Sequence, residues 1–148
     1  RSRNVFDIDL GAMLVFGKFR TGLVVRNLGE PSFEAPDGSQ FQLKRVMRAG
    51  LAVMPNDLLT LAIDVDLNRN VDVLGERRSV SIGAERWWLD KRIAFRSGLR
   101  ANTIGLSRVV PSMGFSVRAS SRVAIDGQIT RGRDGVDRGW GIAARAQF

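Results

Sequence analysis

Two pairs of carboxylates are the residues of this sequence whose spacing most suggests chemistry. Asp64 and Asp66 are two positions apart, as are Asp7 and Asp9, so each pair would point to one face of an extended strand. Such a pair suits acid–base work or calcium binding. The chain has no histidine and no cysteine, which excludes imidazole catalysis, Ser-His and Cys-His mechanisms and most zinc sites. We therefore interpret both pairs as partners of arginines and predict no enzymatic activity, no cofactor and no metal.

Arginine supplies nearly all of the positive charge. The chain has 23 Lys and Arg against 15 Asp and Glu, a net charge of +8, and only three of these basic residues are lysines. A balance this basic favours nucleic acid, lipopolysaccharide or an acidic partner. Arg92, Arg96 and Arg100 recur at every fourth position and suit the binding of anions. We favour a different interpretation of them, a salt-bridged interior.

The elements that must position these charges are strands, because apolar and polar residues alternate along most of the chain. In the last ten residues Trp140, Ile142, Ala144, Ala146 and Phe148 are apolar, and the residues between them are polar, charged or small. The same period of two predicts nine strands and no substantial helix. The predicted strands are 5–16, 19–26, 40–53, 58–68, 78–88, 92–101, 113–118, 122–130 and 139–148.

The connections between these strands alternate in length. The short ones are 17–18, 54–57, 89–91 and 120–121, and the long ones are 27–39, 69–77, 102–112 and 131–138. Short turns at one end and long loops at the other are typical of membrane β-barrels, whose tilted strands need roughly 9–11 residues to cross a bilayer. The fold class that we predict is all-β, an antiparallel up-and-down transmembrane β-barrel, in a single domain over 1–148.

Charged side chains favour one phase of this alternation. On the apolar phase of the strands we find only Arg45 and Arg86, both near strand ends. We predict that the polar phase lines the lumen of the barrel. The charged residues predicted to face the lumen are Arg48, Asp64, Asp66, Glu85, Arg92, Arg96, Arg100, Arg118, Asp126 and Arg145.

The last strand carries a predicted assembly signal made of Trp140, Ile142 and Phe148. Outer-membrane barrels commonly end on such an aromatic strand, which the barrel-assembly machinery reads, whereas the alternative is an ordinary edge strand of a soluble β-domain. Nine strands would leave the two ends of the chain on opposite sides, but bacterial single-chain barrels have an even number of strands. We therefore expect upstream strands to be missing, which makes the chain the C-terminal portion of a larger barrel. If 5–16 is not a strand, eight strands would close a small barrel instead.

A series of sequence runs carries a resemblance to a known family. The runs are 24–29 (VVRNLG), 46–55 (VMRAGLAVMP), 59–67 (LTLAIDVDL), 81–88 (SIGAERWW) and 93–100 (IAFRSGLR). In order and spacing they resemble the PorV/TraF-like outer-membrane barrels of the FadL-like group. The resemblance implies about fourteen strands in the whole barrel, a place in the bacterial outer membrane, and docking of secreted or partner proteins at the external loops.

Two functions follow as hypotheses. The first is a non-enzymatic outer-membrane barrel that acts in transport or as a secretion-associated scaffold. Its expected partners are outer-membrane lipid or lipopolysaccharide, the assembly machinery, and a protein at the external loops. The alternative is a soluble basic β-domain that binds nucleic acid or another polyanion, which requires aromatic and arginine side chains on the same face. Because the aromatics fall mostly on the apolar phase, we expect no nucleic-acid partner.

Overall fold

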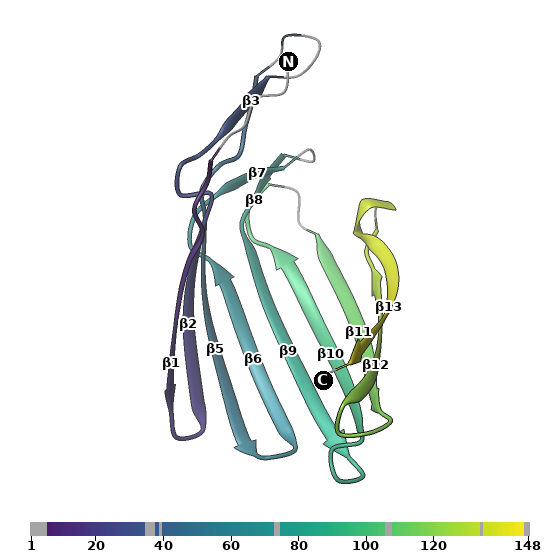
Figure 1. Cartoon of the computed structure of the whole chain (residues 1–148). Coiled ribbons are helices and arrows are strands. Elements are labelled where there is room, and N and C mark those ends of the chain that lie inside the picture. Colours follow the sequence, from purple (N-terminus) through teal and green to yellow (C-terminus); the bar gives the residue numbers. More distant parts are fainter. Residues whose placement is uncertain are drawn as a thin grey trace.

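The architecture is one antiparallel sheet of nine main strands, seen in a computed structural model that describes residues 6–34, 38, 40–72, 75–105, 108–133 and 135–146. The strands follow one another in the order β1-β2-β5-β6-β9-β10-β11-β12-β13, so each pairs with its neighbours along the chain. Their bounds are β1 Leu10–Phe16, β2 Phe19–Arg26, β5 Val46–Asn56, β6 Leu59–Asp66, β9 Ser79–Trp88, β10 Ile93–Asn102, β11 Val109–Arg118, β12 Val123–Arg131 and β13 Arg138–Ala146. This confirms an all-β, up-and-down sheet of nine strands (Figure 1). The sheet is open, because β1 and β13 each have one neighbour among the described residues.

The short turns lie at one end of the sheet and the long connections at the other (Figure 1). The turn between β1 and β2 matches the prediction, with Gly17 at φ +56°. A two-residue hairpin with glycine first favours this positive angle, and it places Phe16 directly opposite Phe19. The connection from β9 to β10 holds three consecutive residues at positive φ, Leu89, Asp90 and Lys91.

Two of the long connections contain small hairpins, which lie largely in segments that we predicted as loop. β3 (Ser32–Glu34) pairs with β4 (Gln40–Gln42), and β7 (Asn70–Asp72) pairs with β8 (Gly75–Arg77). The predicted strand 40–53 was therefore wrong at its start, because its first residues belong to the β3–β4 hairpin and β5 begins at Val46. Strands of three residues are too short to show a period of two.

Other boundaries also differ from the prediction. The first strand begins at Leu10, and β5 continues to Asn56 through a register shift between Val53 and Asn56. Strand β11 begins at Val109, so Pro111 lies inside it. The ladder to β12 starts only at Ser112, which leaves Pro111 in a part of β11 that pairs with β10 alone, as a residue without an N–H requires. A 3-10 helix, η1 (Gly135–Asp137), lies before β13.

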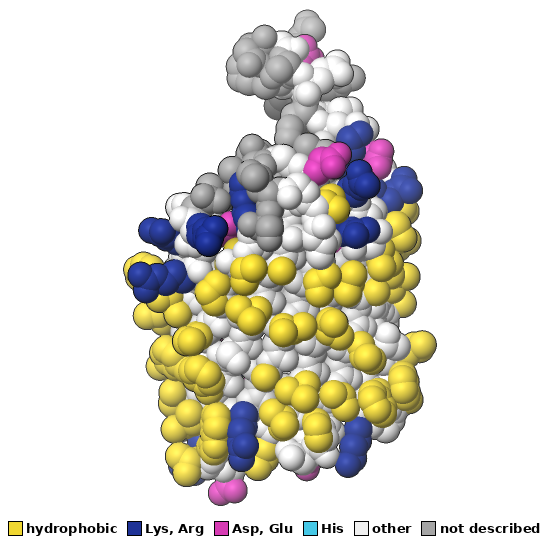
Figure 2. Space-filling view, turned by 180° about the vertical axis from the view of Figure 1, so that it is seen from behind, with side chains coloured by type: hydrophobic (Ala, Val, Ile, Leu, Met, Phe, Trp, Pro, Cys, Tyr) yellow, Lys and Arg dark blue, Asp and Glu magenta, His cyan; other side chains and the backbone are white. Residues whose placement is uncertain are grey.

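The sheet has an apolar convex face and almost no buried core. Among the described residues, Ala94 and Val110 are the only hydrophobic residues that are buried. Side chains that pair across neighbouring strands share a face, and one such row of exposed residues contains Leu14, Leu51, Ile63, Ile82 and Leu99. Figure 2 shows this face covered by a broad hydrophobic band, with Lys and Arg gathered at its two ends.

The described residues include no helix long and apolar enough to span a membrane.

Candidate functional site: the concave polar face

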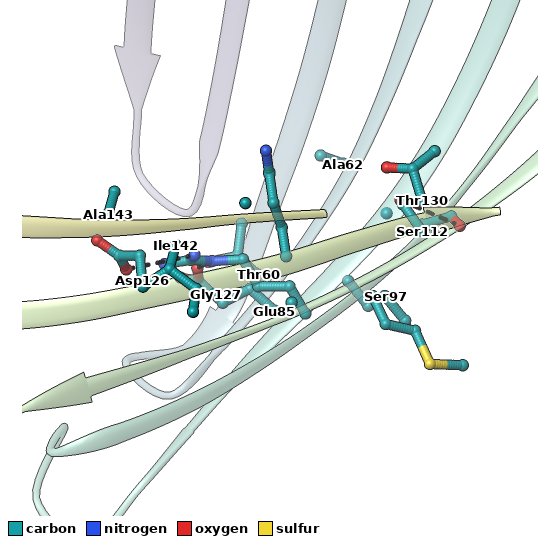
Figure 3. A pocket seen from close by; sticks show the side chains of 18 residues that line it. Thr60, Ala62, Glu85, Ser97, Ser112, Asp126, Gly127, Thr130, Ile142 and Ala143 are labelled. Atoms are coloured by element: carbon teal, nitrogen blue, oxygen red, sulfur yellow. Dashed lines mark hydrogen bonds and ion pairs between the residues drawn. The ribbon is translucent and has the colours of Figure 1, made fainter. Parts of the chain in front are cut away.

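The opposite face of the sheet is concave and polar, and it encloses a hollow. A cavity of about 560 Å³ is lined from β6 to β13. Figure 3 shows side chains around it, among them Thr60 from β6, Glu85 from β9 and Asp126 from β12. Glycine, alanine, serine and threonine form much of the lining. Because these side chains are small, they leave room inside the curve of the sheet.

A cluster of four charged residues crosses this hollow, and we call Glu85, Arg96, Asp126 and Arg145 the central ion cluster. Arg96 donates from Nε to Glu85, and its Nη1 lies 3.6 Å from the Oδ1 of Asp126. Arg145 donates to the other oxygen of Asp126 at 2.9 Å. The cluster joins β9, β10, β12 and β13, so its charges are neutralised within the face on which alternation placed them.

Two side chains that the sequence did not single out complete this cluster. The buried hydroxyl of Ser116 on β11 donates to Asp126. Trp87 donates from Nε1 to Glu85 at 2.7 Å, and Arg118 lies over the Trp87 ring at 5.0 Å. Ser116 is on the polar phase directly opposite Asp126. Only the register between β11 and β12, which the sequence does not show, could have revealed this contact.

The carboxylates of Asp64 and Asp66 do not act as a pair. Asp66 is 2% exposed. It accepts a 2.8 Å hydrogen bond from the guanidinium of Arg48 and a 3.0 Å hydrogen bond from the backbone N–H of Ser79. Asp64 is exposed and has no ion-pair partner in the part of the chain that the structure describes. The same part holds no group of three or more acidic, histidine or cysteine side chains arranged to bind a metal. The geometry therefore favours structural ion pairing over two-carboxylate chemistry.

The predicted ladder of Arg92, Arg96 and Arg100 is divided among three surroundings. Arg96 belongs to the central ion cluster, and Arg100 lies 3.8 Å from Asp137 beyond the end of β12. Arg92 was assigned to a strand, but it lies exposed in the turn before β10. The three side chains therefore do not form one anion site.

The other carboxylate pair extends the ladder between the first two strands. Asp9 accepts from the backbone N–H of Asn27 at 3.0 Å, and Asp7 accepts from that of Gly29 at 3.2 Å. Asn27 has φ +53°, so the chain leaves β2 with a sharp change of direction that these bonds hold. The carboxylates of Asp7 and Asp9 therefore accept hydrogen bonds from the backbone, and they do not form the group of oxygen ligands that calcium requires.

Two of the three predicted assembly residues lie on the convex face of the edge strand β13. Trp140 is 79% exposed and Ile142 is 70% exposed. Phe148 lies outside the described residues. Two further residues near them, Arg131 and Arg138, were predicted to lie in the loop 131–138, whereas the structure places them at the end of β12 and the start of β13. In the register of these strands they pair with each other on the convex face, one step beyond Ile129 and Trp140.

Fold and face together define an all-β protein with an open, antiparallel, nine-stranded sheet, apolar on its convex face and ion-paired on its concave face. Residues 1–66 match a family model described as "F plasmid transfer operon, TraF, protein". The match ends with β6, so it covers less than half of the chain and establishes a similarity to that family over this part. No curated protein and no solved structure matches the chain.

Proposed function

We propose that this chain forms part of a non-enzymatic β-barrel of the bacterial outer membrane. The observation that carries the proposal is the convex face, where the large apolar side chains of nine strands are exposed with charges only at the ends (Figure 2). In water such a surface costs free energy in proportion to its area. In a bilayer it is the lipid-facing band that barrels present.

The open edges of the sheet support a barrel larger than nine strands. Backbone N–H and C=O groups cannot remain unpaired in the hydrocarbon of a membrane, yet β1 and β13 each have a free edge among the described residues. Further strands are needed to join these edges. This requirement agrees with the PorV-like and FadL-like interpretation of the sequence, in which the whole barrel has about fourteen strands.

The two ends of the sheet suit different roles. The long connections carry the β3–β4 and β7–β8 hairpins, and β3 extends beyond the main sheet (Figure 1). We assign this end to the external side, where it would present structured surfaces to secreted or partner proteins.

Transport is the second form of the same proposal. The concave face holds a polar hollow whose central carboxylates are paired with arginines. Of the ten charged residues predicted to face the lumen, six are arginines and four are carboxylates, so the net charge of this face is basic. A permeant would therefore be anionic or amphipathic. Outer-membrane lipid or lipopolysaccharide would contact the convex face, and the assembly machinery would read the last strand.

Extraction of the protein from its native membrane tests the proposal. We expect carbonate at high pH to leave the protein in the pellet and detergent to release it. An unheated sample should migrate differently from a boiled one, because a closed barrel resists unfolding by the gel detergent. Release by carbonate or salt would refute the proposal. That result would favour the soluble basic β-domain, which binding to a nucleic acid or another polyanion would then test.

A further inference from the structure

The convex face of the last three strands contains an apolar groove. It has a volume of about 180 Å³ and is lined mainly by Phe115, Ile129, Trp140 and Ile142, with Gly127 as its floor. The glycine is required there, because a Cβ at this position would overlap the ring of Phe115. The groove is therefore a built feature of β11, β12 and β13, and its walls have the shape and chemistry to hold a hydrocarbon chain.

Two arginines lie at the end of this groove nearest the long connections. On the same face, Ile129 pairs with Trp140, and the next pair in the ladder is Arg131 with Arg138. One such step along a strand is about 7 Å. Like charges directly opposite each other destabilise a sheet, and neither arginine has an ion-pair partner among the residues that the structure describes.

Arg138 is held in place but remains able to bind. Arg138 donates from Nε to the carbonyl of Gly132 at 3.0 Å and from Nη2 to the carbonyl of Arg133 at 3.1 Å. A guanidinium has five donors, so several remain. Arg131 and Arg133 are exposed. With Arg138 they bring three positive charges to this corner of the sheet, where the carboxylate of Asp137 faces Arg100 at 3.8 Å.

We propose that this surface binds one membrane lipid that has a phosphate headgroup, with an acyl chain in the groove and the phosphate on Arg131 and Arg138. The proposal rests on the membrane barrel and names a lipid site on it. Arginine forms paired hydrogen bonds to phosphate oxygens, and an anion would remove the repulsion between the two arginines. At the external end of an outer-membrane barrel, the lipid with this chemistry is the phosphorylated lipid anchor of lipopolysaccharide.

The test is native mass spectrometry of the full-length protein in a neutral detergent, titrated with this phosphorylated lipid anchor, with its dephosphorylated form and with inorganic phosphate. We expect retention of one phosphorylated lipid per protein. The double substitution Arg131→Gln with Arg138→Gln should weaken retention about tenfold. Trp140→Ala should weaken both lipid forms, because it removes one wall of the groove. Arg122→Gln removes an exposed arginine at the short-turn end and is the matched control.

The proposal is overturned if the double variant retains the lipid as well as the parent does, or if the dephosphorylated form binds equally well. It is also overturned if inorganic phosphate alone competes as effectively as the lipid, since the groove would then contribute nothing. Each variant is first checked for heat-dependent gel mobility, so that loss of folding is not read as loss of binding. A protein that remains membrane-bound but shows no preference for the phosphorylated lipid refutes the lipid site and leaves the barrel intact.

Discussion

Residues of the same type on the same strand differ here in what they do. Asp64 and Asp66 point to one face of β6, but only Asp66 is buried, and it satisfies both the guanidinium of Arg48 and the backbone N–H of Ser79. Because the side chain of Arg48 is 45% exposed, water can solvate its guanidinium when Asp66 is removed. This solvation reduces the free-energy cost of losing the ion pair. The larger cost comes from the amide of Ser79, a buried residue whose N–H would lose its acceptor.

Substitution at these two positions separates the structural carboxylate from the exposed one. We expect Asp66→Ala to lower the free energy of unfolding by about 2 kcal/mol, because a buried donor without a partner costs about 1–3 kcal/mol. Asp64→Ala, the matched control on the same strand and face, should change it by less than about 0.5 kcal/mol. Denaturant unfolding in detergent, followed by tryptophan fluorescence, measures both. Equal effects at the two positions would contradict the assignment.

At the scale of elements, sequence patterns predicted the main strands and turns but not the fine structure of the loops. Each main strand has seven or more residues. This length is sufficient for the alternation of apolar and polar residues to identify the strand from the sequence. The three-residue strands of the β3–β4 and β7–β8 hairpins give no such signal. Residues 102–112 were predicted as loop, although β11 begins at Val109 and accommodates Pro111 before the ladder to β12 starts.

The loop between β12 and β13 depends on one glycine. Gly132 is buried, its N–H donates to the carbonyl of Asp137 at 2.9 Å, and a Cβ added to it would overlap the Cβ of Asp137. Because that atom is fixed to the backbone, the loop must shift. We expect Gly132→Ala to cost about 2 kcal/mol and to speed hydrogen exchange in the loop.

The same loop offers the control. At Gly135 an added Cβ meets nothing within 4 Å, so Gly135→Ala should leave unfolding and exchange close to those of the parent. The measurement is hydrogen–deuterium exchange of the 131–138 peptide together with denaturant unfolding. A Gly132→Ala protein with unchanged exchange would show that this loop relaxes at no cost.

On the scale of the whole molecule, the sequence predicted which face a side chain occupies better than it predicted which side chains meet. Alternation alone separated the charged residues of the central ion cluster from the apolar convex face. It could not supply the register that brings Ser116 to Asp126 or Asp137 to Arg100, because contacts across strands depend on pairing between distant segments. For the same reason the spacing of Arg92, Arg96 and Arg100 did not show that, among the described residues, only Arg96 and Arg100 have carboxylate partners, while Arg92 lies exposed in a turn.

The two faces make a prediction that the chain is well suited to test, since it contains no cysteine. On β6 the side chains of Thr60 and Ala62 point to the hollow, and those of Leu61 and Ile63 point to the convex face. Single substitutions to cysteine at 60, 61, 62 and 63 therefore place one thiol on alternate faces.

If the convex face meets lipid, a water-soluble maleimide should label positions 60 and 62 about ten times faster than 61 and 63 in membranes, because the reactive thiolate needs water. Solubilisation and unfolding should then make all four equal. Labelling of 61 and 63 at the rate of 60 and 62 in intact membranes would mean that the apolar face is open to water, and the barrel would have to be abandoned.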